Sequence, residues 1–174
     1  GQHSHAARLA GALLGRTRYE RGEIDTAEVL LEQCHELGAE SGVADFMIAT
    51  YSTLARIKSL RGDIDEALSL LEEGRQAAQQ LSLPRLSAAL DSECVRLHLA
   101  LDDIPRAQAA FARTSDIATG SDGIAMAIRH YQLGMHARIR CANKDYDAAL
   151  KLLSGVRTES STVGWRYAET SSLI

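Results

Sequence analysis

Residues 61–67 read Arg-Gly-Asp-Ile-Asp-Glu-Ala, and a Leu-rich run follows them. This order is typical of a tight turn between two antiparallel helices. Gly62 allows the first helix to end, and the acids after it favour the positively polarised N-terminus of the second helix. Ala67 is small enough for two helices to approach closely, while Leu71 supplies an apolar side chain one turn later.

The same pattern occurs four times. Its other copies occupy residues 21–27, 101–107 and 143–149, so the starting positions are 40, 40 and 42 residues apart. A single helical hairpin cannot bury its apolar face, and must stack on its neighbours. The sequence therefore predicts an all-α fold, a superhelix of antiparallel helix pairs with about four repeats of 40–42 residues.

Apolar spacing and the positions of glycine and proline predict nine helices. Eight are expected at residues 6–21, 25–38, 43–60, 65–81, 84–101, 105–118, 124–142 and 147–156. In the second of them we expect Val29, Leu30, Leu31 and Leu37 to face inward. Residues 157–162 are polar and predict a turn, after which Trp165 and Tyr167 belong to a ninth helix that the chain end truncates. We interpret residues 1–174 as a single helical-repeat domain taken from a longer chain.

The composition excludes several classes of protein. The net charge of -4 argues against an overall binder of nucleic acid or membrane surfaces, because phosphate affinity needs clustered positive charge. No apolar run approaches the length needed to span a bilayer, and the start of the chain lacks the order of a signal peptide. Cys34, Cys94 and Cys141 form no local pair, which fits a reducing compartment. We therefore expect a cytoplasmic protein.

The repeats resemble tetratricopeptide repeats. Residues 62–67 look like the turn of such a repeat, and Tyr51, Leu54, Ala55 and Leu71 stand where the family places its aromatic, leucine, small and large apolar residues. The period of 40, together with Leu-Ser-Leu-Pro-Arg-Leu at residues 81–86, resembles the repeat domain of MalT-type LuxR-family activators. The resemblance covers essentially the whole chain and implies a right-handed superhelix.

Members of that family are large ATP-binding bacterial regulators, in which a central helical-repeat sensor binds an inducer or a regulatory protein. The resemblance implies that role for this chain. This chain contains no G-x-x-x-x-G-K-[ST] motif and no basic recognition helix, so we expect neither ATP hydrolysis nor direct binding of nucleic acid.

The candidates for chemistry are weak. Cys94 and His98 lie four residues apart and in principle could share a metal, as could His130, His136 and Cys141. Neither set has the paired spacing of structural zinc sites, so ordinary packing is the simpler interpretation. The carboxylates fall at turns and helix starts, where the helix dipole explains them, and the methionines are expected in the core. We therefore expect no enzyme activity, no metal and no cofactor.

One set of residues is not explained by packing. An arginine stands 11 residues before the last alanine of every turn motif, and small residues stand four positions before each arginine. The arginines, here called the arginine column, are Arg16, Arg56, Arg96 and Arg138, and the small residues are Ala12, Ser52, Ser92 and Gly134. In tetratricopeptide-like arrays this position of the first helix points into the concave groove. Arginine suits bidentate capture of carboxylate or phosphate, so we predict a ligand groove lined by the arginine column, Ser52 and Ser92.

Two alternatives stay open for the arginine column. Each arginine could instead pair with a nearby acid, as Arg16 could with Glu20 and Arg96 with Glu93.

The function of the chain also has two alternatives. It is either a regulatory sensor that binds a small-molecule inducer or a regulatory protein, or a general scaffold that binds a peptide or partner helix. The exposed ends of the repeat array also predict self-association.

Overall fold

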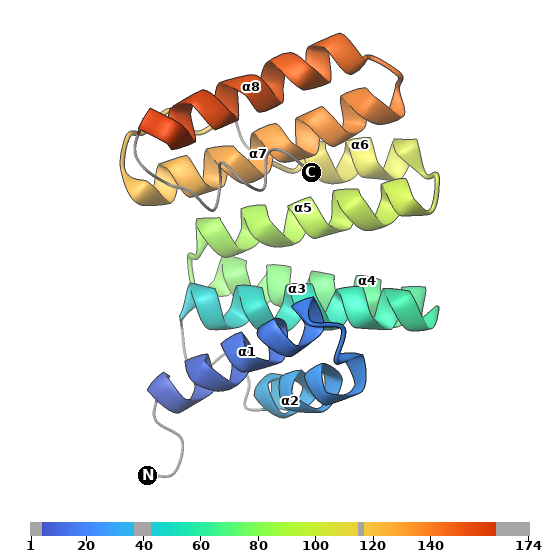
Figure 1. The fold of residues 1–174 in the computed structure, drawn as a ribbon, viewed down its shortest axis with the longest axis vertical. Helices are drawn as coiled ribbons and strands as arrows, with labels where there is room; N and C mark the ends of the chain where they lie inside the picture. The colour runs from blue at the N-terminus through green and yellow to red at the C-terminus, as the bar shows by residue number, and fades with distance from the viewer. Residues whose placement is uncertain (1–4, 37–42, 115–116, 163–174) are drawn as a thin grey trace. The chain divides into compact units, whose positions relative to one another are not determined.

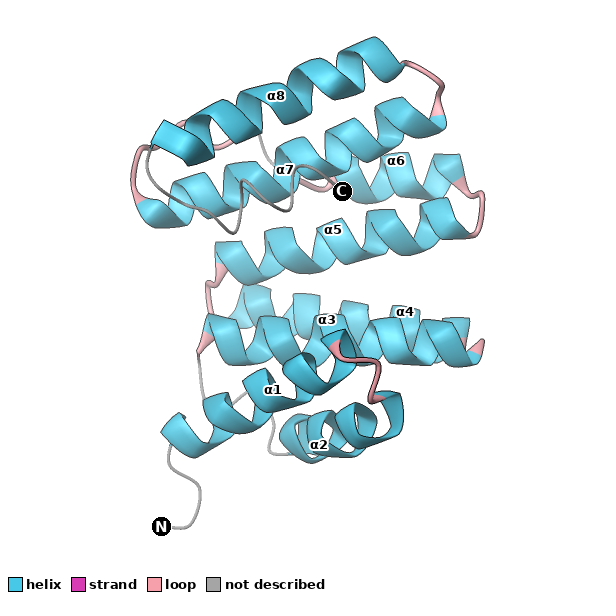
Figure 2. Cartoon of the chain, viewed as in Figure 1, coloured by secondary structure: helices cyan, strands magenta, loops and turns pink. Residues whose placement is uncertain are grey.

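The computed structural model describes residues 5–36, 43–114 and 117–162 (Figure 1). These residues form eight α-helices and, over the same ranges, contain no strand (Figure 2). The helices are α1 (His5–Glu20), α2 (Ile24–Glu36), α3 (Ala44–Arg61), α4 (Ile64–Gln80), α5 (Pro84–Ala100), α6 (Ile104–Ala112), α7 (Gly123–Ala142) and α8 (Tyr146–Thr162). The predicted all-α array of antiparallel helix pairs is confirmed, while the ninth helix falls on residues 163–174, outside the described residues.

The chain divides into two compact units, residues 1–90 and residues 91–174, with the boundary inside α5. In the first unit, α1 pairs with α2 and α3 pairs with α4, and α3 also packs on both helices of the preceding pair. In the second unit, α7 packs on α6 and pairs with α8. The first helix of each pair (α1, α3, α5 and α7) is called A-type below, and the second (α2, α4, α6 and α8) B-type. Curvature and handedness of the array stay predictions.

The turn between the two helices of a pair has the same backbone in all four repeats. Its residue with positive φ is Gly22 (78°), Gly62 (91°), Asp102 (58°) or Lys144 (63°). The N–H of the next residue donates to a carbonyl five positions earlier, over 2.8–2.9 Å in every copy. This bond closes the end of a helix through a left-handed residue, the arrangement that glycine favours. The turn predicted from residues 61–67 is therefore confirmed, and it recurs in each copy of the motif.

Two predicted helix limits are wrong. Residues 157–162 do not form a turn, because α8 continues without interruption to Thr162. The helix expected over residues 105–118 is shorter, since α6 ends at Ala112. Both errors fall at the far end of a B-type helix, where polar residues leave the apolar pattern without a clear limit.

The predicted inward face of α2 is only partly correct. Val29 does not face inward: 54% of it is exposed, whereas Leu31 is fully buried. Leu30 is intermediate, and Leu37 lies outside the described residues. The reason is the helical period, since Leu31 lies one turn after the buried Ala27 and Val29 lies between them on the opposite side of α2.

The core of the first unit follows the turn motif. Ala27, Leu31, Leu54, Ile57 and Leu70 form one buried cluster, against which Tyr19 and Ile24 pack. Close approach of helices is required there, because a Cβ at Gly15 would lie 2.7 Å from Cγ of Leu31. The last alanine of each turn motif is buried in all four repeats, as the sequence predicts.

Two Gly→Ala substitutions should change stability in opposite directions. Gly62→Ala should lower the free energy of unfolding by more than about 1 kcal/mol, because alanine is strained at a φ of 91°. Gly155→Ala should raise it by about 0.5–1 kcal/mol, because Gly155 lies within α8 and a Cβ there meets no atom within 4 Å. Urea unfolding measures the change in the free energy of unfolding for both variants. Two changes of the same sign would contradict the left-handed turn.

Candidate partner-binding site

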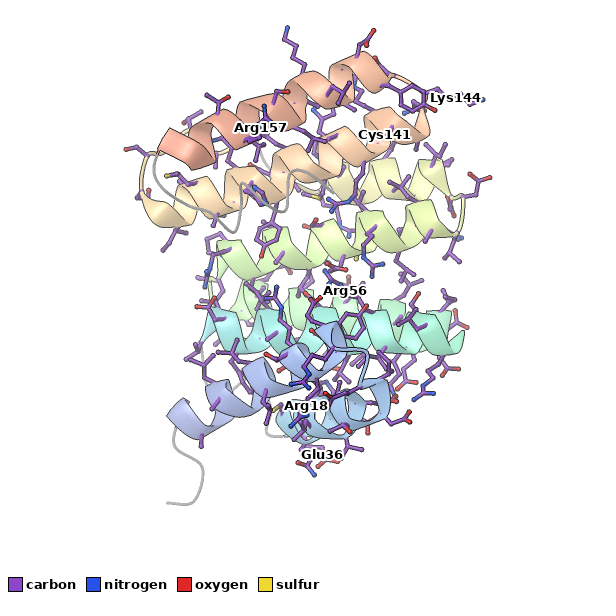
Figure 3. All side chains as sticks on the ribbon, in the orientation of Figure 1. Arg18, Glu36, Arg56, Cys141, Lys144 and Arg157 are labelled. Carbon is purple, nitrogen blue, oxygen red and sulfur yellow. The ribbon has the colours of Figure 1, made fainter. Side chains whose placement is uncertain are left out.

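The arginine column is divided between the two units. Arg16 lies in α1 and Arg56 in α3 of the first unit, while Arg96 lies in α5 and Arg138 in α7 of the second. Arg138 is exposed, and the other three are partly exposed. Figure 3 labels Arg56 on α3. All four side chains therefore come from A-type helices, and whether they line one continuous groove stays a prediction.

The small residues before the arginines lie in or near the helix contacts. Ser52 and Ser92 are both buried, so little of either hydroxyl is accessible in this structure. At Gly134 the expected room for a guanidinium group is present, because a Cβ there would lie 3.1 Å from Nη1 of Arg138. The Arg138 side chain thus extends back over Gly134, one turn earlier on α7.

Arg96 makes the ion pair that the sequence left open. Its Nε donates to Oε2 of Glu93 over 2.7 Å. Glu93 is buried, so removing Arg96 would leave a carboxylate in a poorly solvated site. This pair gives Arg96 a structural role in α5, whatever else its guanidinium group contacts.

The structure shows a second basic set that the sequence reasoning missed. Two residues after each member of the arginine column stands another basic side chain in the last turn of the A-type helix: Arg18, Lys58, His98 and Arg140. Arg18 pairs with Glu23, and Arg140 pairs with Asp145 over 3.2 Å. These acids directly follow the left-handed residue, so the pairs fasten the turn that joins the two helices.

Lys58 carries the largest of these ion-pair networks. Its Nζ lies 3.0 Å from Glu28, 2.9 Å from Glu32 and 3.3 Å from Glu66. The hydrogen bond to Glu32 is the main cause that raises the pKa of the Lys58 ammonium group, so this amine stays charged. The same acidic helix, α2, also accepts from Arg61 through Asp25 and Glu28. Lys58 and Arg61 therefore join α2 to α3.

A polar cluster around the buried Tyr51 joins three helices of the first unit. Tyr51 donates its hydroxyl to Oε1 of Glu73 over 3.0 Å, and Nε2 of His35 lies 3.0 Å from the same oxygen. The two rings meet edge to face with centroids 5.4 Å apart. Burial, followed by the charge of Glu73, raises the pKa of the Tyr51 hydroxyl, which therefore remains a hydrogen-bond donor. The cluster therefore links α2, α3 and α4 through one carboxylate oxygen of Glu73.

In the second unit, α7 fixes the loop that precedes it. Nη1 of Arg129 donates to the carbonyls of Ala118 and Gly120, over 2.6 and 2.9 Å. Oε1 of the buried Gln132 accepts from the N–H of Ala118 over 2.9 Å. Asp122 caps the N-terminus of α7, and those backbone hydrogen bonds lower the pKa of its carboxyl. Side chains of α7 thus hold the segment at residues 118–120 that precedes it.

The charges are segregated by helix type. The four A-type helices contain 11 Lys and Arg but four Asp and Glu, whereas the four B-type helices contain four Lys and Arg but 10 Asp and Glu. The difference is largest between α7, which has three arginines and no acid, and α2, which has four acids and no Lys or Arg. Although the chain is net acidic, its A-type helices taken together are therefore basic, and α5 alone among them has equal numbers of basic and acidic residues.

Among the described residues, no group of three or more His, Cys, Asp or Glu is placed to hold a metal ion. Cys34, Cys94 and Cys141 are free thiols, and the first two are buried. Over the same ranges, no helix combines the length and apolar character that crossing a bilayer requires.

A sequence profile of the tetratricopeptide repeat matches residues 3–33 and 48–73. Curated relatives include the serine/threonine-protein kinases PknK of two Mycobacterium tuberculosis strains and of Mycobacterium bovis. Each is 38% identical over 154 residues, which are 88% of this chain and 12% of the relative. The chain is therefore a helical-repeat domain similar to tetratricopeptide repeats. Such repeats generally mediate contacts with partner proteins, while the aligned part is only a small share of each relative's length.

The histidines of the second unit should make its stability depend on pH. Burial lowers the pKa of His98, His130 and His136. For His136 the geometry agrees, because its ring stacks on Phe111 and its Nε2 accepts from Nε of Arg140 over 3.1 Å. Since Arg140 can only donate, that contact requires a neutral imidazole.

The sign follows from these lowered pKa values. The contribution of these neutral histidines to the free energy of unfolding is fully present above the unfolded-state pKa of about 6.5. It is lost as the pH falls toward the lowered folded-state pKa. We expect the melting temperature to drop between about pH 7.5 and pH 5.5, and the drop to be smaller in His136→Phe, which keeps an aromatic ring beside Phe111. An equal drop in both proteins would contradict a partly buried, neutral His136.

Proposed function

We propose that this chain is a non-enzymatic repeat domain of a bacterial regulatory protein, and that it binds an acidic segment of a partner protein through the arginine column. The charge segregation carries the proposal: the basic residues of a net acidic chain are concentrated on one of its two helix types. Electrostatic complementarity steers association and favours a partner of opposite charge. Within each unit, two arginines one repeat apart suit an acidic segment.

Two independent similarities support a regulatory setting. The curated relatives are named as serine/threonine-protein kinases, so the matching segment occurs within signalling enzymes. The 40-residue period and the segment at residues 81–86 resemble the sensor repeats of MalT-type LuxR-family activators. In this proposal, partner binding is passed on to other domains of a larger protein. A small-molecule inducer, which the second resemblance implies, is the alternative ligand.

The choice of arginines for a test follows from the ion pairs. Arg96→Ala is unsuitable, because it would leave the buried Glu93 without its ion pair. Arg56 and Arg138 provide one site in each unit. The matched control is Arg75→Ala with Arg157→Ala, which removes the same charge from the B-type helices α4 and α8, again one in each unit. Figure 3 labels Arg157 on α8.

Arg56→Ala/Arg138→Ala should weaken binding of a glutamate-rich peptide by about 1.5–3 kcal/mol for each charge-assisted hydrogen bond removed. Added salt should weaken wild-type binding as well, because the interaction is ionic. Calorimetric titration with this peptide measures both effects, and the melting temperature is the control for folding. If the control pair weakens binding equally, net charge and not the arginine column is responsible, and the proposed site is wrong.

A further inference from the structure

A glycine stands in the interior of α7, where it weakens the helix. Gly134 lies well inside the span of α7, Gly123–Ala142. Glycine destabilises a helix interior relative to alanine, because its backbone loses more conformational freedom on folding. The presence of Gly134 therefore needs a cause other than helix formation.

Packing between helices explains other interior glycines of this chain. A Cβ at Gly15 of α1 would lie 2.7 Å from Cγ of Leu31 in α2, and one at Gly74 of α4 would lie 2.8 Å from Cγ of Tyr51 in α3. These glycines let two helices approach each other closely. At Gly134 the described residues give a different result, because the atom that a Cβ would meet within 4 Å is Nη1 of Arg138, on the same helix.

The Arg138 side chain occupies the space that Gly134 leaves open. Long side chains on a helix lean toward its N-terminus, over the preceding turn. A Cβ at Gly134 would lie 3.1 Å from Nη1 of Arg138, so a side chain there would force the guanidinium group to move by a few tenths of an ångström. After burial, the charge of Arg138 is the second cause that lowers the pKa of His130, which agrees with a guanidinium group directed toward the N-terminus of α7.

No carboxylate of its own helix directs Arg138, because the 20 residues of α7 contain no Asp or Glu. Arg96 provides the contrast. It donates to Glu93, three positions earlier in α5, and the residue four positions before it is the buried Ser92. Within its own helix, Arg96 is thus directed by an ion pair, whereas Arg138 lies over the space at Gly134.

We propose that Gly134 is a positioning residue for partner binding: it keeps open the space across which Arg138 presents its guanidinium group to a carboxylate of the acidic segment. This inference rests on the proposed function, which assigns Arg138 to the binding site. Arginine holds a carboxylate through two parallel N–H groups, so the direction of the guanidinium plane decides whether both hydrogen bonds form. A side chain at position 134 keeps the charge of Arg138 but turns its N–H groups away from that direction.

Gly134→Ala and Gly134→Gln should change peptide binding and stability in opposite directions. We expect the dissociation constant of the glutamate-rich peptide to rise about 3-fold in Gly134→Ala and about 10-fold in Gly134→Gln, whose longer side chain fills more of the space. Both variants should raise the melting temperature by about 1–4 °C, because alanine and glutamine favour helix over glycine. Calorimetric titration and thermal unfolding measure the two effects.

Gly155→Ala is the matched control. It makes the same substitution in α8 of the same unit, at a position where a Cβ meets no described atom within 4 Å. It should raise the melting temperature as Gly134→Ala does and leave the dissociation constant unchanged. A Gly155→Ala variant that binds as weakly as Gly134→Ala would overturn the proposal, since a stiffer helix and not the position of Arg138 would then weaken binding.

A double-mutant cycle assigns the effect to Arg138. In an Arg138→Ala background, Gly134→Ala should no longer weaken peptide binding, while its effect on the melting temperature remains. If Arg138→Ala weakens binding but both Gly134 variants bind like the wild type, the positioning role is wrong and the proposed function stands. If Arg138→Ala itself leaves binding unchanged, Arg138 is not part of the binding site and both fail. Weaker binding together with a lower melting temperature would also overturn the positioning role, because Gly134 would then serve packing.

Discussion

The left-handed residue between the two helices of each pair is the constraint on which the rest of the structure depends. At Gly22, Gly62, Asp102 and Lys144 the backbone takes positive φ, and the following N–H returns to the last turn of the preceding helix. One conformation, used four times, sets the angle at which every B-type helix leaves its A-type helix. Residues at equal distance from the turn therefore occupy equivalent positions in each pair. This explains why both the buried alanines and the basic side chains recur at fixed positions.

The ion pairs of the last A-type turn reinforce that constraint. Arg18 and Arg140 reach the acid directly after the left-handed residue, and Lys58 reaches acids of α2 and α4. A cation at this place also faces the negatively polarised end of the A-type helix. Individually, exposed pairs contribute little, but the little-exposed Lys58 bridges three carboxylates and so couples three helices.

Features that depend on residues close together in the sequence, such as the turns, could be predicted from the sequence. Features that depend on contacts between helices could not. The turns follow from glycine, acid and alanine at fixed spacing, and all helices except α6 and α8 end close to their expected limits. Counting helical positions from the buried Ala27 could have distinguished the buried Leu31 from the exposed Val29. The extension of α8 through residues 157–162 could not be predicted, because these polar residues do not continue an apolar helical pattern. The candidate site divides in the same way: repeat spacing was enough to find the arginine column, but not the network around Lys58, whose acids come from two other helices.

The central claim is that the basic A-type helices form the partner-binding surface. Isotope-labelled chain titrated with a glutamate-rich peptide and followed by amide chemical shifts tests this claim most directly. The account predicts that the largest, salt-sensitive changes fall on α3 and α7, around Arg56 and Arg138. Changes centred on the acidic helices α2 and α4, with α3 and α7 unaffected, would contradict it.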